Sequence, residues 1–168
     1  MTADDALGRA ATAWREGRLL EAQSTYQELL KAQPTAWPAA FQLAWLDAAV
    51  GELAPARARA LDRAGLSAEA HRRAQALIAQ AESGAYADGS IADWDIGALD
   101  AAGEDQDEDW WLDRGKRAWK VGLFGVAHAC YERAARRWNV LYDDPPSWAQ
   151  GALTQADDHV RAVMDPDA

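Results

Sequence analysis

The chain has a single cysteine, Cys130, and few β-branched residues. One cysteine excludes an internal disulfide and cannot supply the thiolate set of a structural zinc site. We expect Cys130 to be a small buried hydrophobic residue. Val, Ile and Thr together number 14, whereas 40 residues are alanine. Because alanine has the highest helix propensity and strands favour β-branched residues, this composition predicts an all-α fold.

The chain also lacks long hydrophobic runs. Even the most apolar window, residues 43–50, contains Asp47, and the first nine residues lack the apolar segment of a secretory signal. We therefore expect one cytoplasmic domain or a short repeat array. The chain has 17 Lys and Arg residues and 27 Asp and Glu residues, which gives a formal net charge of −10. This charge argues against nucleic-acid and membrane partners and favours a protein or peptide, with a basic partner suited to the overall charge.

A short pattern recurs along the chain at a period typical of helical repeats. Gly17, Leu19, Ala22 and Tyr26 return 34 residues later as Gly51, Leu53, Ala56 and Ala60, and near the end as Gly122, Phe124, Ala127 and Tyr131. A glycine can end one helix and form a turn, and the large residue two positions later seats the next helix. The small alanine lets the two helices approach, and the aromatic residue fills the space between them. We therefore predict three copies of one helical hairpin.

This pattern resembles the tetratricopeptide repeat family, whose helix-turn-helix units stack into a right-handed superhelix with a concave groove. The last copy matches best, because Trp111, Gly115 and Ala134 also fall at positions of the family signature. The Sel1-like repeat family, with slightly longer repeats, is the nearest competitor, and residues 131–135 would suit it. The resemblance implies a right-handed α-solenoid of antiparallel helical hairpins.

The expected units follow from this resemblance. They are residues 3–34 (first repeat), 37–67 (second repeat), 68–106 (a degenerate acidic unit), 107–140 (the best-matching repeat) and 147–164 (a capping helix). Within the degenerate unit we expect a helix over 68–83 and at most a short one near 91–101. The last helix carries Asp157, Asp158 and His159, which we interpret as an exposed polar face at the end of the solenoid.

In the resembled family the first helix of each hairpin lines the groove, so its outward residues form the candidate binding site. These are Trp14, Arg15, Phe41, Gln42, Trp45, Arg72, Lys116, Trp119 and Lys120. Aromatic side chains flanked by Arg and Lys are typical of peptide-binding hot spots. An alternative is that Trp14, Trp45 and Trp119 fill gaps between alanine-rich helices. The leading prediction is a non-catalytic adaptor that binds a protein or peptide in this groove.

The negative charge is concentrated in one segment. Residues 84–113 hold 10 acidic and no basic side chains, and the densest part is Glu104, Asp105, Asp107, Glu108 and Asp109. One interpretation is a solvated loop whose carboxylates complement the dipole of the following helix. The alternative is a docking segment, which would make the protein an acidic inhibitor or immunity-type protein that binds a basic target through residues 84–113.

The sequence carries no pattern of a common catalytic or metal site. It lacks a phosphate-binding loop, a Gly-x-Ser-x-Gly elbow and a dinucleotide fingerprint. Its three histidines lie on different expected helices, and His128 and Cys130 point to different sides of one helix. We therefore predict no enzymatic activity, no cofactor and no metal. For an enzyme, the expected site would be the broken repeat, around Trp94 and Trp110.

Overall fold

The structure is a computed structural model of residues 1–168, and it describes residues 2–60, 68–138 and 147–164. The helices are α1 (Ala3–Arg15), α2 (Leu19–Ala32), α3 (Trp37–Ala49), α4 (Leu53–Ala60), α5 (Ala68–Glu82), α6 (Ile91–Trp94), α7 (Ile96–Gly103), α8 (Glu108–Lys120), α9 (Phe124–Trp138) and α10 (Ser147–Met164). The described residues contain no β-strand, which confirms the predicted all-α class. None of the helices in these ranges is both long and apolar enough to cross a membrane.

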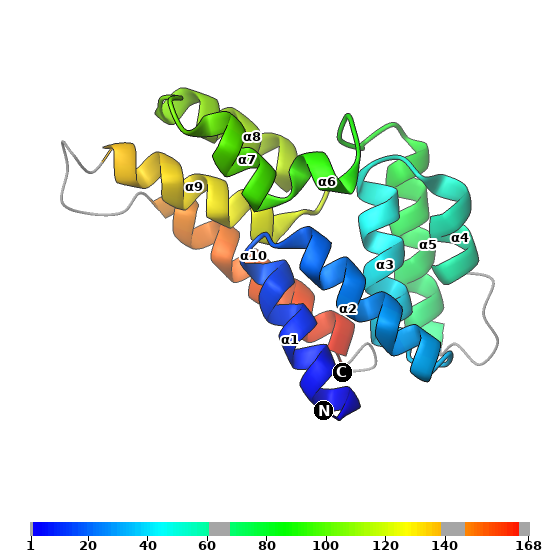
Figure 1. Cartoon of the computed structure of the whole chain (residues 1–168). Helices are drawn as coiled ribbons and strands as arrows, with labels where there is room; N and C mark the ends of the chain where they lie inside the picture. Colours follow the sequence, from blue (N-terminus) through cyan, green and yellow to red (C-terminus); the bar gives the residue numbers. More distant parts are fainter. Residues whose placement is uncertain (1, 61–67, 139–146, 165–168) are drawn as a thin grey trace.

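The same turn joins α1 to α2, α3 to α4 and α8 to α9 (Figure 1). Gly17, Gly51 and Gly122 adopt the left-handed conformation, with φ of 80°, 82° and 84°. In each turn the glycine N–H donates to the carbonyl three residues before at 3.1 Å, and the next N–H donates to the carbonyl five residues before at 2.8 to 2.9 Å. These two bonds satisfy carbonyls at the end of the first helix. The recurring glycine therefore marks three turns of one geometry.

Within a hairpin, the repeated residues form the contact between the two helices. A Cβ built on Gly115 of α8 would collide with the ring of Tyr131 of α9, which is buried. In the first hairpin, Leu19, Ala22 and Tyr26 are also buried. The small residue of one helix thus receives the aromatic ring of the other, as the spacing predicts.

The chain departs from the hairpin pattern after α5. Gly84 adopts a left-handed φ of 88°, but no helix follows until Ile91, where the short helices α6 and α7 begin. The carboxylate of Asp95 caps α7 by accepting from the N–H of Gly97, and it also accepts from the N–H of Leu20 at 3.0 Å. These bonds fix the two short helices to the start of α2.

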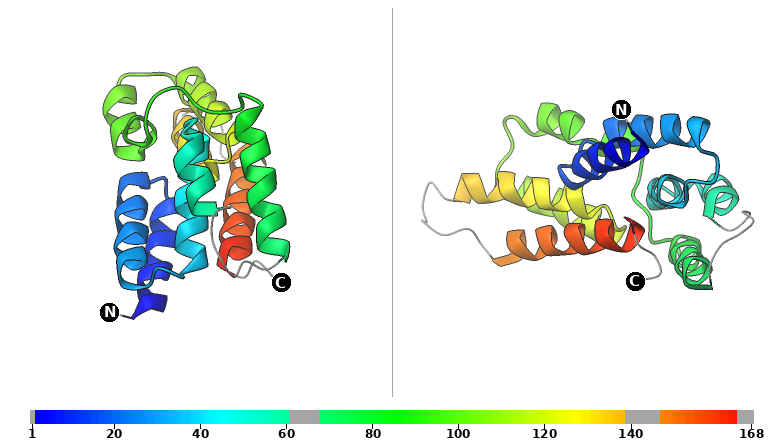
Figure 2. Two further views of the ribbon diagram at one scale, coloured as in Figure 1. Left: turned by 90° about the vertical axis from the view of Figure 1, so that its right-hand side faces the viewer. Right: turned by 90° about the horizontal axis from the view of Figure 1, so that it is seen from below.

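The last helices fold back onto the first ones. α9 contacts α1, and α10 lies along α9 and also contacts α1 and α3 (Figure 2). The approach is closest at Gly125 of α9, where a Cβ would overlap the carbonyl oxygen of Trp14. In an open solenoid each unit contacts only its neighbours in sequence. In this chain the first and last hairpins are also in contact.

Two clusters of buried residues form the core. The larger draws on α1 to α3 and α6 to α10 and includes Trp14 and Trp111, and the smaller lies between α3, α4 and α5 and includes Phe41 and Leu77. Cys130 belongs to the larger cluster and is 0% exposed. Burial raises the pKa of its thiol to about 12, which agrees with the predicted structural role.

Candidate functional site

Two adjoining pockets form a groove between α3, α5 and the C-terminal helices. The first, about 250 Å³, is lined by Phe41, Trp45, Arg73, Ala76, Leu77, Gln80 and His159. The second, about 490 Å³, is lined by Trp45, Gln80, Trp119, Lys120, Gly122, Phe124 and Gln155. Trp45 and Gln80 line both pockets, so the two adjoin each other. We call them together the central groove.

Trp45 separates the two pockets, and a turn glycine fixes its position. Its indole Nε1–H donates to the carbonyl oxygen of Gly122 at 2.8 Å. A Cβ built on Gly122 would lie 2.8 Å from that same nitrogen. The residue that allows the left-handed turn therefore also allows the close approach of the ring. The sequence feature that marks the hairpin thus positions the central side chain of the groove.

Further aromatic rings surround Trp45. The centroid of its ring lies 5.9 Å from that of Phe41 and 6.4 Å from that of Phe124. Trp119 of α8 packs edge-on against Phe124, with the centroids 5.4 Å apart. Such rings offer a large apolar contact area with few rotatable bonds. α3 and α8 thus bring together three of the predicted groove aromatics, and α9 adds Phe124.

α10 closes the inner side of the groove with a histidine. The ring centroid of His159 lies 4.3 Å from that of Trp45 and 4.4 Å from that of Trp14. Its Nε2 lies 2.7 Å from Oε1 of Gln42. Burial lowers the pKa of His159 to about 3, so the ring is neutral at pH 7 and donates to the amide oxygen. The prediction that His159 lies on an exposed polar face is therefore wrong, because its side chain is only 8% exposed.

Two residues predicted to bind a partner lie in the core instead. Trp14 and Gln42 are each 0% exposed, because α10 packs over this part of α1 and α3. A ligand reaches neither side chain while α10 is docked. The binding prediction is therefore wrong for both residues. Trp14 instead agrees with the alternative that it fills space between the helices.

Three predicted cationic residues do not line the central groove. Arg15 lines a separate pocket, where its guanidinium lies 3.3 Å from the carboxylate of Asp157. Arg72 and Lys116 are exposed on α5 and α8. On α5 the lining position belongs to Arg73. A shift of one residue rotates a side chain by about 100° around a helix axis, which explains the difference between Arg72 and Arg73.

The groove also contains residues that sequence reasoning missed. They are Arg73, Ala76, Leu77, Gln80, Gly122, Phe124, Gln155 and His159. His159 had a detectable signal, because Ala152, Ala156 and His159 follow the i, i+4, i+7 spacing of a buried helical face. All three side chains are buried. Leu77 had a similar signal, because Ala74, Leu77, Ile78 and Ala81 are buried at the spacing i, i+3, i+4, i+7. Arg73, Ala76 and Gln80 lie outside that face, and their place in the groove depends on how α5 packs against α3.

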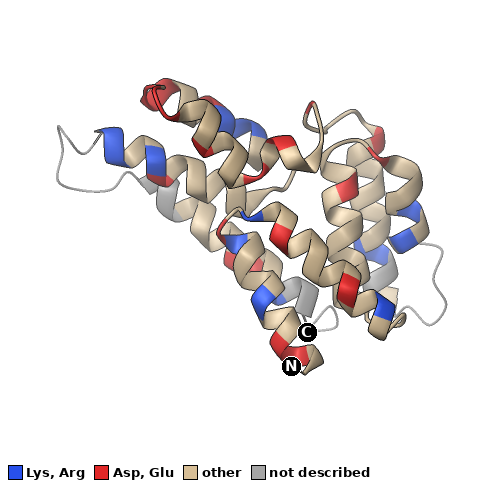
Figure 3. Ribbon diagram, viewed as in Figure 1, with Lys and Arg blue, Asp and Glu red and all other residues tan. Residues whose placement is uncertain are grey.

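The predicted acidic docking segment lies at the end of α7 and the start of α8, at the upper left of Figure 3. Glu104, Asp105, Asp107 and Asp109 are exposed, and Glu108 is half-buried. The carboxylate of Asp107 caps α8 by accepting from the N–H of Trp110 at 3.1 Å. This contact agrees with the interpretation that the segment supports the helix that follows it.

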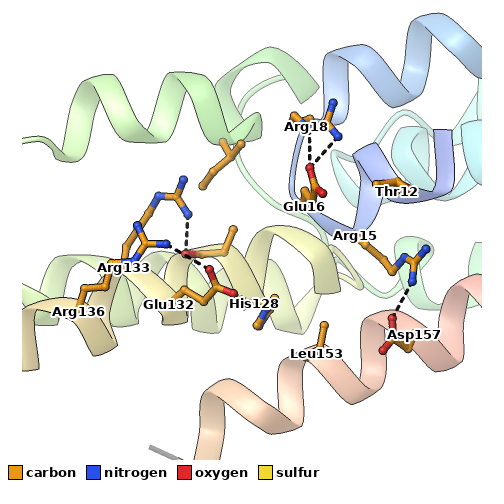
Figure 4. A pocket seen from close by; sticks show the side chains of 12 residues that line it. Thr12, Arg15, Glu16, Arg18, His128, Glu132, Arg133, Arg136, Leu153 and Asp157 are labelled. Atoms are coloured by element: carbon orange, nitrogen blue, oxygen red, sulfur yellow. Dashed lines mark hydrogen bonds and ion pairs between the residues drawn. The ribbon is translucent and has the colours of Figure 1, made fainter. Parts of the chain in front are cut away.

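A separate pocket of about 580 Å³ lies between α1, α9 and α10 (Figure 4). Four arginines line it, and each has a carboxylate partner: Arg15 with Asp157, Arg18 with Glu16, Arg133 with Asp100, and Arg136 with Glu132. The ion pairs balance the positive charge of the pocket. Two of them join different helices, α1 to α10 and α9 to α7. We therefore interpret these pairs as structural contacts.

The described residues contain no group of three or more His, Cys, Asp or Glu that could hold a metal ion. Burial raises the pKa of Asp47 to about 6, although the guanidinium of Arg59 lies 3.5 Å away and opposes the shift. At the broken repeat, the indole N–H of Trp94 donates to the carbonyl oxygen of Asp88 at 2.7 Å. Trp94 is buried there, in the core between α2 and α6.

The central groove is thus where three predicted aromatic residues, Phe41, Trp45 and Trp119, meet one predicted cation, Lys120. Its function has to be inferred from its own geometry and charge. A scan against protein-family models, a search of curated proteins and a search of solved structures each find no match to this chain.

Proposed function

We propose that this chain is a non-catalytic cytoplasmic adaptor, built as a right-handed solenoid of tetratricopeptide-type hairpins, that binds a protein or peptide partner in the central groove. One observation supports the proposal most directly. Two adjoining pockets are lined by Phe41, Trp45, Trp119 and Lys120, which the family resemblance implies face a ligand. Tryptophan is one of the residues enriched at the hot spots that dominate binding energy at protein interfaces.

The amide groups of the groove also suit a polypeptide ligand. Gln80 of α5 lines both pockets, and Gln155 of α10 lines the second. A glutamine amide offers a donor and an acceptor together, as a peptide group does. Two pockets with amides beside them therefore fit a chain segment that places successive side chains in the groove.

Replacement of Trp45 by alanine should weaken binding at least about tenfold, because the ring forms a wall of both pockets. The ligand is a peptide selected from a random display library on the full-length chain, and its affinity is measured by fluorescence polarisation. Trp37→Ala is the matched control. Trp37 lies on the same helix and packs on Phe41 at 5.0 Å, but it lines neither pocket. An affinity unchanged in Trp45→Ala, or reduced equally in both variants, would move the binding site elsewhere.

A second candidate function is that of an acidic inhibitor or immunity-type protein that binds a basic target through residues 84–113. The exposed carboxylates around the start of α8 support it (Figure 3). It predicts a different pattern of results. Conversion of Asp105, Asp107, Glu108 and Asp109 to amides would abolish binding of a basic target, added salt would weaken it, and Trp45→Ala would leave it unchanged.

A further inference from the structure

The central groove continues past Lys120 into a third pocket. This pocket, about 610 Å³, is lined by Gly84, Ala85, Tyr86, Ala87, Asp88, Arg117, Lys120 and Val121. Lys120 lines both the second and the third pocket, so these two adjoin at its side chain. Tyr86 is 48% exposed, unusually open for a large hydrophobic side chain. Three adjoining pockets, which we call the pocket path, thus lie in succession between Phe41 and Tyr86.

The first two pockets carry a charge opposite in sign to that of the whole chain. The net charge of the chain is −10, yet none of the described residues that line the first two pockets is Asp or Glu. Arg73 and Lys120 line these pockets, and Arg117 lines the third together with one carboxylate, Asp88. Lys116 lies one helical turn before Lys120 on the same face of α8. This local charge attracts an acidic ligand and repels a basic one.

The two lysines of α8 are available to a ligand. Lys116 and Lys120 are exposed, and neither forms an ion pair or a hydrogen bond with another described residue. Arg117 differs, because its guanidinium lies 3.1 Å from the carboxylate of Asp113. An exposed ammonium group can pair with a carboxylate without displacing an existing partner.

The first pocket requires an apolar group. Its walls include the rings of Phe41 and Trp45 and the side chain of Leu77, and its volume of about 250 Å³ leaves room for one bulky side chain. Exposed ion pairs contribute little affinity, whereas burial of an aromatic or aliphatic side chain contributes much. In this groove the apolar side chain would hold the ligand, and the lysines would select its charge.

We infer that the ligand of the central groove is an acidic peptide segment with one bulky apolar side chain. That side chain occupies the first pocket, and a carboxylate of the segment faces Lys120, with Lys116 one helical turn away beside the groove. The inference rests on the proposed function and adds the chemical class of the ligand.

The test uses a random peptide library displayed and sorted on the full-length chain. The selected peptides should be rich in Asp and Glu on both sides of a Trp, Phe or Leu. Lys120→Glu should weaken binding of a selected peptide about fivefold at low salt. Lys31→Glu, the same change at an exposed lysine of α2, should alter the affinity less than about twofold. A peptide with its carboxylates changed to lysine should bind Lys120→Glu better than it binds the wild type.

The outcomes separate this inference from the proposed function. Selection of basic peptides would contradict the inference that the ligand is acidic. Equal affinity of the wild type and Lys120→Glu for a selected peptide would contradict it as well. The chain could also self-associate in a concentration-dependent way that Lys120→Glu abolishes. That result would mean that the groove binds the acidic segment of a second copy, and it would contradict the inferred peptide ligand. In these cases, a loss of binding in Trp45→Ala would still support the groove as the binding site. If a selected peptide binds Trp45→Ala as tightly as the wild type, the proposed function of the groove is wrong.

Discussion

Replacement of Gly125 by alanine should lower the free energy of unfolding by about 3 kcal/mol, measured by urea denaturation. A Cβ at this position would overlap the carbonyl oxygen of Trp14 and lie 2.9 Å from Cα of Arg15. Both neighbours are backbone atoms of α1, so no side-chain rotation can relieve the overlap. The helices α1 and α9 would have to separate, which would loosen the packing around the buried Trp14.

Two other helical glycines provide the control for Gly125→Ala. A Cβ on Gly8 of α1 or on Gly151 of α10 would meet no atom within 4 Å. Because alanine is the better helix former, Gly8→Ala and Gly151→Ala should each stabilise the chain by up to about 1 kcal/mol. A Gly125→Ala variant as stable as these two would show that α9 does not pack on α1 in solution.

The second large effect is expected from His159, through the pH dependence of stability. Burial lowers its pKa to about 3 in the folded chain, whereas the ordinary value is 6.5. Below about pH 6.5 the unfolded chain takes up a proton that the folded chain does not, so the free energy of unfolding falls as the pH falls. The slope is about 1.4 kcal/mol per pH unit down to the folded pKa. Between pH 7.5 and pH 5 the contribution of His159 should therefore fall by about 2 kcal/mol.

Comparison with His159→Phe isolates this contribution. Phenylalanine keeps a ring against Trp14 and Trp45 but does not titrate. The variant should be less stable at pH 7.5, because the buried amide oxygen of Gln42 loses its hydrogen bond. At pH 5 the difference in the free energy of unfolding between the wild type and the variant should be about 2 kcal/mol smaller than at pH 7.5, as measured by urea denaturation. Parallel pH profiles of the two proteins would mean that His159 is exposed to solvent and that α10 is not docked.

The comparison is needed because Asp47 acts in the opposite direction. Its pKa is raised from 3.8 to about 6 in the folded chain, so the folded state binds the proton more tightly. This stabilises the fold as the pH falls through about 6 and offsets part of the loss from His159. Wild type and His159→Phe both keep Asp47, so its contribution cancels in the difference between them.

The parts of the fold that could be predicted from sequence are those with local causes. Gly17, Gly51 and Gly122 mark three turns, because a left-handed φ and the hydrogen bonds of the turn involve only residues close in the chain. The docking of α10 has distant causes. It depends on His159 meeting Trp14 and Gln42, which lie more than 100 residues away, and no local spacing encodes such a contact.

The same difference explains which groove residues were predicted well. Trp14 and Trp45 both lie on the first helix of a hairpin and both were expected to face a ligand. α10 covers Trp14 completely, whereas Trp45 remains half-buried and lines two pockets. The repeat pattern identifies the face of the helix, but only the three-dimensional position of α10 decides which part of that face stays open.

The contact of the first hairpin with the last helices also constrains the order of folding. During synthesis α1 and α2 emerge before α9 and α10, and their turn can form at once from local hydrogen bonds. Trp14, however, gains its cover only when α9 and α10 have emerged, because Phe124 and His159 pack against its ring. Contacts between the ends of a chain slow folding relative to a stack of local repeats. A nascent chain would therefore expose Trp14 until α9 and α10 have been synthesised, and the hairpins made before them would need protection from aggregation during that time.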